Sequence, residues 1–161
     1  MSPPDLLLFE GDWASYEDKV YEAFLESFVR ADVRFRGWRV KAQYRPETRG
    51  KGFSFWHTIS EAPDPKNRNE DDRIPNLRRC ERIRWVRWAI ENAEKDGFSW
   101  WENLRSGNTH VVIWAREYDF AVVLAKRRDY YVLKTAFAEI TSHRRSAFER
   151  ERVEFERALK G

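Results

Sequence analysis

The sequence contains a single cysteine, Cys80, and no long apolar segment. One cysteine cannot form a disulfide within the chain. The longest apolar runs, such as residues 6–9 and 121–125, are far shorter than the roughly 18 residues that cross a bilayer. The N-terminal residues also lack the basic and apolar regions of a secretory signal. From these absences we expect a cytoplasmic protein that is not inserted in a membrane.

Several motifs with known chemistry are absent as well. The sequence has no glycine-rich phosphate loop, no CxxC pair, no HExxH and no GxSxG. The histidines, His57, His110 and His143, are scattered along the chain, and no carboxylate follows them at the spacing of a metal ligand. We therefore expect no cofactor and no bound metal. Cys80, which lacks a neighbouring histidine, is expected to be buried and inert.

The chain is instead rich in arginine and in aromatic residues. Of its 30 basic residues 22 are arginine, and it has 8 tryptophans, 11 phenylalanines and 6 tyrosines. Arginine pairs with phosphates through two N–H groups, and aromatic rings stack on bases. This combination favours a nucleic-acid-binding protein. The alternative is an ordinary surface on which arginine stems cover tryptophan rings.

The residue patterns predict an α+β fold in one domain, residues 1–161, because helical periodicity and strand alternation occur in separate segments. The expected helices are an N-terminal helix over residues 15–31, a short central helix over residues 77–93 and a C-terminal helix over residues 142–160. The expected strands are residues 35–44, 53–60, 109–115, 120–125 and 130–138. The last three strands are separated by short polar loops and predict an antiparallel meander.

The helix starts carry capping residues, and the central helix is ambiguous. Ser15 opens a capping-box pattern, and Asn76 can cap the central helix. Leu77, Cys80 and Ile83 then form an apolar stripe, with arginines on the other side. From Trp85 onward apolar residues surround the whole helix. This segment is therefore either packed on most sides or interrupted near Trp85.

Two groups of polar residues are candidates for a site. His57 follows two aromatic residues, and its ring can exchange a proton near neutral pH. It is equally compatible with a packed histidine that bonds to a backbone carbonyl. Six arginines but only one carboxylate, Glu81, lie between residues 73 and 87, which is the strongest local charge bias in the chain. Its alternative interpretation is a solvated helix face.

A third group lies on the last expected strand and the turn after it. Strand alternation places Tyr131 and Thr135 on one face and Lys134 on the other. Cleavage of RNA without a metal ion requires a base for the 2′-hydroxyl, an acid for the leaving 5′-oxygen and donors for the crowded phosphate. The three groups together provide candidates for all of these roles.

Three segments, residues 55–60 (FWHTIS), 73–82 (RIPNLRRCER) and 131–136 (YVLKTA), carry a resemblance to a known superfamily. Together with the order of elements from Trp13 to the last helix, they resemble the barnase, EndoU, colicin and RelE-like ribonucleases, particularly the compact toxin-like and phage-associated members. The resemblance implies helices beside an antiparallel sheet whose exposed face binds RNA. It also implies RNA, such as tRNA or mRNA, and a cognate antitoxin or immunity protein as partners.

The resemblance further implies site residues in this chain. His57 would act as base or acid, Arg79 and Arg82 would clamp phosphate, and hydroxyl donors would come from the last strand. The expected catalytic residues are His57, Arg82, Tyr131 and Thr135. The expected RNA-binding residues are Arg78, Arg79, Lys134, His143 and Arg144. Because no second histidine lies near His57 in the sequence, either His143 completes the acid and base pair or arginine and tyrosine replace it.

Two alternatives to a ribonuclease remain open at this level. One is a domain that binds RNA or DNA in a groove of arginine and tryptophan without cleaving it. The other is a protein-interaction module with a tryptophan-rich patch, since tryptophan, tyrosine and arginine are preferred interface residues. Substitution of His57 separates the nuclease from the binder, and salt dependence separates phosphate binding from an aromatic interface.

Overall fold

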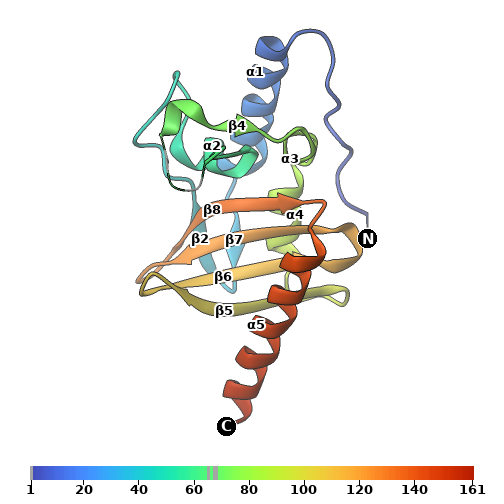
Figure 1. Cartoon of the computed structure of the whole chain (residues 1–161), viewed down its shortest axis with the longest axis vertical. Coiled ribbons are helices and arrows are strands. Elements are labelled where there is room, and N and C mark those ends of the chain that lie inside the picture. The colour runs from blue at the N-terminus through green and yellow to red at the C-terminus, as the bar shows by residue number, and fades with distance from the viewer. Residues whose placement is uncertain (1, 65, 67–68) are drawn as a thin grey trace.

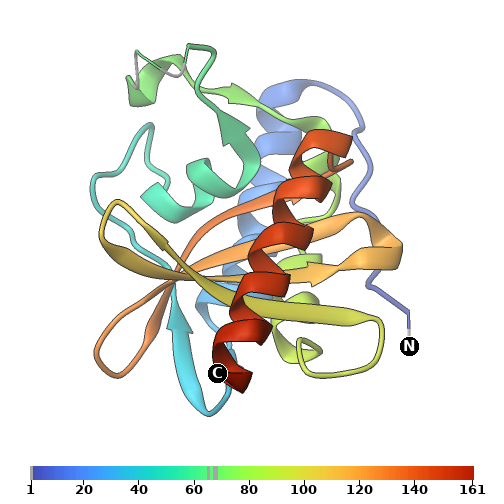
Figure 2. The same cartoon turned by 60° about the horizontal axis from the view of Figure 1, so that its bottom comes forward.

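A computed structural model describes residues 2–64, 66 and 69–161 of the chain. The protein has the expected α+β fold, in which helices lie on both faces of a twisted six-stranded sheet (Figures 1 and 2). The strand order is β1-β2-β8-β7-β6-β5, and every neighbouring pair is antiparallel except β2 and β8, which are parallel. The strands are β1 (Arg34–Phe35), β2 (Trp38–Lys41), β5 (Phe98–Arg105), β6 (Asn108–Ala115), β7 (Phe120–Lys126) and β8 (Tyr131–Ala138).

The expected meander of three strands is confirmed as β6, β7 and β8, and β5 extends it by a fourth strand. Residues 98–105 were not among the expected strands, although a turn pair, Ser106-Gly107, follows them in the sequence. Ser106 and Gly107 both have positive φ angles, 51° and 79°, which is the geometry of a two-residue turn that matches the twist of a hairpin. This turn returns the chain directly onto a partner strand.

The expected strand over residues 35–44 is wrong in its length, because a tight turn divides it into β1 and β2. Arg36 and Gly37 have φ angles of 50° and 88°, so the chain reverses there and the two short strands pair with each other. Alternation of apolar and basic residues on both sides of Gly37 looks continuous in the sequence. The reversal depends on the backbone freedom of one glycine.

The segment expected as a strand over residues 53–60 is wrong: it is the helix α2 (Phe53–Ile59), followed by the two-residue strand β3 (Ser60–Glu61). The hydroxyl of Thr58 donates to the Ser54 carbonyl at 2.7 Å, as a helix allows. Phe55 and Ile59, four residues apart, are both fully buried. The alternation of aromatic residues resembled a strand, but the same residues also satisfy helical spacing.

Helix α2 takes the place of a strand beside β8. Strand β2 pairs with Tyr131 and Val132 at the start of β8, and no strand among the described residues pairs with the same edge of β8 beyond them. Ser54 of α2 donates its hydroxyl to the Leu133 carbonyl at 3.0 Å. Packing against this open edge overrides the strand preference of the aromatic residues.

The N-terminal helix is confirmed with shifted ends. It comprises α1 (Trp13–Phe24), and a π-helical segment, Leu25–Val29, continues it. Asp12 rather than Ser15 is the cap, and its carboxylate accepts a hydrogen bond from the Ser15 N–H at 2.9 Å.

The central helix is interrupted before Trp85, which decides between the two alternatives. It consists of α3 (Leu77–Glu81) and α4 (Trp85–Glu91). Cys80 and Ile83 are fully buried as expected, whereas Leu77 is exposed and does not belong to the stripe. Burial raises the pKa of the Cys80 thiol to about 12, which opposes formation of a thiolate. The break lets α4 turn its tryptophans into the core.

The C-terminal helix is confirmed as α5 (Ser142–Lys160), capped by Thr141 and not by Ser142. It crosses the face of the sheet opposite α1 (Figure 2). The face toward α1 is covered by a large apolar core that includes α1, α2 and α4, whereas the face toward α5 carries a smaller cluster around Trp101, Trp114 and Phe148. The two faces are therefore covered unequally.

A β-bulge in β8 sets which of its side chains face α5. Val123 pairs with Thr135 but Leu124 pairs with Leu133, so Lys134 is an extra residue in β8. Leu133 faces the α1 core, and Phe137 faces the α5 cluster. The expectation that Tyr131 and Thr135 share one face is wrong, because the bulge shifts the alternation by one residue.

A small arm connects α2 with α3. It contains β3, a 3-10 turn at Glu70–Asp72 and the strand β4 (Ile74–Pro75), which pairs with β3. The proline-, aspartate- and asparagine-rich composition of residues 63–72 is typical of a loop. The described residues of this segment lie in the arm, and residues 65, 67 and 68 are outside the described residues. Within the described part of the chain, no helix has the length and apolar character needed to span a membrane.

Candidate functional site

A cleft of about 530 Å³ lies on the α5 side of the sheet, with walls from α2, β3, β8 and the first turn of α5. Among the described residues, its lining includes five cationic side chains and a single carboxylate, Glu61. The cationic residues are Arg73, Arg79, Arg105, Lys134 and Arg144. His57 and His110 also line it. The cleft thus combines two titratable imidazoles with a strong positive charge.

His57 occupies the last turn of α2 and faces the cleft. Its ring stacks on Phe53, one helical turn earlier, with 4.0 Å between the ring centroids. Its Nε2 lies 2.8 Å from the Oε1 atom of Glu70 in the arm. Burial, followed by the positive charge of Arg73, lowers the pKa of His57, and Glu70 opposes this shift.

The Glu70 contact determines which nitrogen of His57 is available. A carboxylate only accepts hydrogen bonds, so Nε2 carries the proton and donates it to Glu70. The neutral ring therefore has its lone pair on Nδ1. The lowered pKa keeps this neutral form dominant at neutral pH, which is the state required of a proton acceptor.

Two arginines of the cleft are held by Ser60 at the end of α2. The Ser60 carbonyl accepts from Nη2 of Arg73 at 2.6 Å and from Nη1 of Arg79 at 3.4 Å. Nε of Arg73 also donates to the Ser60 hydroxyl at 2.9 Å. Arg79, only 4% exposed, pairs in addition with Glu61. Both guanidinium groups are thus anchored to β3 beside His57.

Lys134 and Thr135 both line the cleft, which corrects the expectation that they point to opposite sides. The bulge produces this arrangement. The Thr135 hydroxyl donates to the His57 carbonyl at 2.7 Å, so it fixes α2 onto β8. Nζ of Lys134 lies 5.8 Å from the centroid of the Phe53 ring on which His57 stacks. Burial and then the charge of Arg127 lower the pKa of Lys134.

The lining of the cleft also includes Arg105, His110 and Arg144. Arg144 stands in the first turn of α5 and lies over the Phe137 ring, 3.9 Å from its centroid. Burial lowers the pKa of His110, and the hydrogen bond to the Asn108 carbonyl opposes this shift.

Four of the expected site residues are not part of the cleft lining. Arg82 lies over the Trp85 ring at 5.0 Å and donates to the Glu81 carboxylate at 3.3 Å. Arg78 pairs with Glu81 at 3.0 Å and with Glu139 at 3.2 Å. Carboxylates thus neutralise Arg78 and Arg82 despite the local charge bias, and the buried Arg79 does not share their face as the sequence pattern suggested.

The other two expected site residues outside the cleft lining are Tyr131 and His143. Tyr131 faces the α1 core and packs edge-on against Phe35, because it precedes the bulge. His143 is exposed on α5. The pairing of His57 with His143 that the sequence suggested does not form within this cleft.

The tryptophans serve the core more than the surface. Five of the eight are buried, namely Trp56, Trp85, Trp88, Trp101 and Trp114. Arginine guanidinium groups cover several of their rings, such as Arg49 over Trp56 at 4.7 Å. The described lining of the cleft contains phenylalanine but no tryptophan. A groove of arginine and tryptophan is thus not the form that the site takes.

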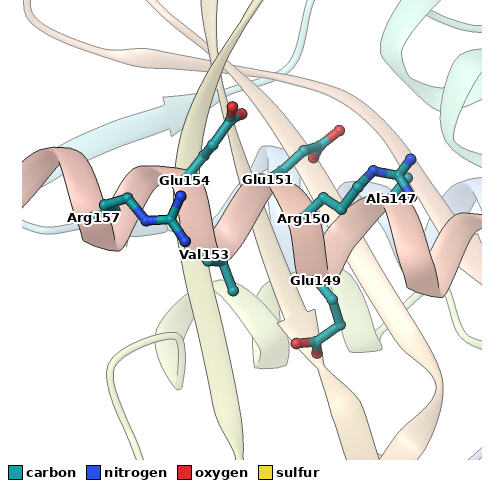
Figure 3. Close-up of a pocket in the computed structure, with 7 residues that line it drawn as sticks. All are labelled: Ala147, Glu149, Arg150, Glu151, Val153, Glu154 and Arg157. Carbon is teal, nitrogen blue, oxygen red and sulfur yellow. The ribbon is translucent and has the colours of Figure 1, made fainter.

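A second hollow runs along the outer side of α5 (Figure 3). All seven of its lining residues come from this one helix, and their side chains spread along it without converging. A surface without an opposing wall offers little burial to a ligand. The cleft beside His57 is the better candidate.

Sequence reasoning did not assign Glu70, Arg73, Arg105 or His110 to the site. Alternation along β6 places His110 on the face of Val112 and Trp114, which is a signal that could have been used. Glu70 and Arg73 reach His57 and Ser60 through an irregular arm. No periodic pattern reports such a contact.

Comparisons with known proteins return no match for this chain. No protein-family model matches it, and no curated protein or solved structure is similar at a significant level.

Proposed function

We propose that the protein is a metal-independent endoribonuclease that cleaves RNA in the cleft beside His57. The observation that carries the proposal is the His57–Glu70 pair, with 2.8 Å between Nε2 and Oε1, at the wall of a cleft with five cationic side chains. A neutral imidazole beside fixed cations suits removal of a proton from a hydroxyl near a phosphate.

The reaction begins with the ribose 2′-hydroxyl. Nδ1 of His57 takes its proton, the 2′-oxygen forms a bond to the adjacent phosphorus, and Glu70 stabilises the resulting imidazolium. The bond from phosphorus to the 5′-oxygen then breaks, and Lys134 protonates the leaving oxygen. The lowered pKa of Lys134 makes its ammonium group a stronger acid. The products are a 2′,3′-cyclic phosphate and a 5′-hydroxyl end.

Arg73 is suited to the phosphate in the transition state. Its two bonds to Ser60 hold it in place before substrate arrives, and preorganised donors act more strongly than mobile ones. Thr135 is assigned a positioning role, since its hydroxyl proton is used in the bond to the His57 carbonyl. Arg82 and Tyr131 are not needed in this scheme.

The proposed setting is the cytoplasm, where RNA is available and a free thiol such as Cys80 stays reduced. A toxin-like nuclease of this kind requires an inhibitor. An antitoxin or immunity protein with acidic side chains would complement the charge of the cleft.

The test is cleavage of RNA by the purified protein in EDTA. We expect a 2′,3′-cyclic phosphate product, and a loss of about 10²-fold or more in His57→Ala. His143→Ala is the matched control, because this histidine is exposed outside the cleft, and it should keep wild-type activity. Full activity in His57→Ala would disprove the assignment.

A second candidate is a domain that binds RNA without cleaving it. It is favoured by the Thr135 and Phe53 contacts of His57, which would also suit a histidine with a purely structural role. Under this alternative the wild-type protein yields no cyclic phosphate and His57→Ala binds RNA normally, with an affinity that falls steeply as salt is added.

A further inference from the structure

Part of the cleft lining, made of residues other than those that contact His57, has features of its own. We call the group Arg79, Arg105, Arg144 and Phe137 the arginine end. The guanidinium groups of Arg79 and Arg144 both lie over the Phe137 ring, 5.1 and 3.9 Å from its centroid. Arg144 in turn is close enough to Arg105 for their charges to interact. Two guanidinium groups, which remain charged in proteins, are thus held against one phenylalanine ring, and a third, that of Arg105, acts on Arg144 beside them.

The arginine end has too little negative charge of its own. Glu61 is the only carboxylate among the described residues of the cleft lining, against five cationic side chains. Burial lowers the pKa of Arg79, Glu61 opposes this, and Arg144 and Arg73 add to the lowering. Such mutual repulsion is relieved when an anion binds between the cations.

Arg79 lies close to other cations and also lacks a full set of hydrogen-bond partners. Its side chain is 4% exposed, and its buried Nε has no hydrogen-bond partner. Buried polar groups of this kind are uncommon in folded proteins and call for an explanation. A guanidinium group that is held for an incoming ligand provides one.

Glu61, the partner of buried Arg79, is itself exposed. The Glu61 side chain is 59% exposed, and it belongs to the two-residue strand β3 at the start of the arm. An exposed carboxylate can leave its partner at small cost, because water solvates it. The carboxylate therefore occupies a place where another oxyanion could bind to a buried arginine.

We propose that the arginine end is a subsite for a phosphate group that displaces Glu61 from Arg79, separate from the phosphate that reacts beside His57. The identity of its ligand as RNA rests on the proposed function, but the phosphate chemistry does not. The phosphate can be the terminal phosphate of an RNA chain or the internal phosphate of a neighbouring nucleotide.

The first experiment measures binding of inorganic phosphate by calorimetry at constant ionic strength. Glu61→Gln removes the competing charge and should raise the affinity roughly tenfold, whereas Arg144→Met should lower it roughly tenfold. Arg150→Met is the matched control, since this exposed arginine of α5 lies outside the cleft and should leave the affinity unchanged. Equal affinities in all four proteins, with melting temperatures that show each is folded, would overturn the subsite.

The second experiment separates the subsite from the proposed function. His57→Ala should bind inorganic phosphate as tightly as the wild type. Phosphate binding that depends on Glu61 and Arg144, without any RNA cleavage by the wild type, would support the subsite and reject the nuclease. If the wild type cleaves RNA but neither Glu61→Gln nor Arg144→Met changes the affinity for phosphate, the nuclease is supported and the subsite is rejected.

The third experiment identifies the source of the phosphate. RNA oligonucleotides of one sequence, with and without a 5′-phosphate, are titrated into His57→Ala and into the double variant that adds Arg144→Met. If the phosphorylated oligonucleotide binds more tightly and Arg144→Met abolishes this difference, the ligand of the subsite is a terminal phosphate. Equal affinities that fall together in the double variant assign an internal phosphate. No effect of Arg144→Met on either oligonucleotide contradicts the subsite.

Discussion

The two faces of the central sheet differ although the same strands build them. Toward α1, the central parts of β6 and β7 present apolar side chains such as Ile113 and Leu124, which are fully buried. Toward α5, the same two strands present Trp114 at one end and His110 at the other. Helix α5 covers one part of this face, and the cleft occupies another. Strand alternation thus lets one sheet hold the fold together on one face and leave charged groups accessible on the other.

The largest effect is expected for stability on the α1 face. Phe120→Ala removes a ring that is 1% exposed and packs edge-on against Trp85, so the free energy of unfolding should fall by about 3–5 kcal/mol. The control Leu104→Ala, at a residue that is 75% exposed on β5, should change it by less than about 0.5 kcal/mol. Denaturant unfolding measures both. A similar loss in the two variants would show that the α1 face is not the main source of stability.

On the α5 face the corresponding effect should be on activity. Lys134→Met removes the proposed acid and should lower RNA cleavage about 10²-fold. Stability should be kept or increased, because burial and the charge of Arg127 already disfavour the ammonium group. Lys95→Met, at an exposed lysine outside the cleft, serves as the control in the same cleavage assay. Unchanged cleavage in Lys134→Met would remove Lys134 from the mechanism.

Thr135 contributes both to stability and to the proposed activity, so its substitution shows whether the two effects can be separated. Thr135→Val keeps the shape but loses the 2.7 Å bond to the His57 carbonyl, which should cost about 1 kcal/mol of stability. Because the same bond positions His57, kcat should fall more than this stability loss explains, with KM little changed. Thr135→Ser should restore both. If the serine variant behaves like valine, the hydroxyl does not position His57.

The smallest effect concerns pH. The pKa of His57 and that of His110 are lowered in the folded protein, so the unfolded chain binds protons more readily near pH 6.5. Their contribution to stability is complete above that pH and is lost as the pH falls below it toward the folded pKa values. Unfolding curves at a series of pH values should show this fall, and His57→Gln should reduce it. An unchanged profile in His57→Gln would mean that the folded protein does not disfavour the charged ring.

The parts of the fold that follow from local pattern were predictable from the sequence. The meander and α5 were found because alternation and helical spacing act within single segments. Helix α2 was missed because its conformation depends on the open edge of β8. There the Leu133 carbonyl accepts a hydrogen bond from Ser54, 79 residues away in the sequence. A pattern confined to residues 53–60 carries no information about that edge.

The site was also predictable only in part. His57, Arg79, Lys134, Thr135 and Arg144 were expected, and all of them line the cleft. Arg82 and Tyr131 were expected and do not, because Glu81 and Trp85 engage the arginine and the bulge turns the tyrosine toward α1. Charge bias located the arginines correctly but could not indicate which carboxylates neutralise them.

The extra residue in β8 has a consequence for how this chain can change in length. If Lys134 were deleted, Leu133 and Thr135 would still lie opposite Leu124 and Val123, so β8 would pair with β7 as a regular strand and Phe137 would still face α5. A loss of three nucleotides from the coding sequence would thus remove this lysine without exchanging core residues and cleft residues. The pairing of the strand tolerates the omission of Lys134, whereas the proposed acid is lost with it.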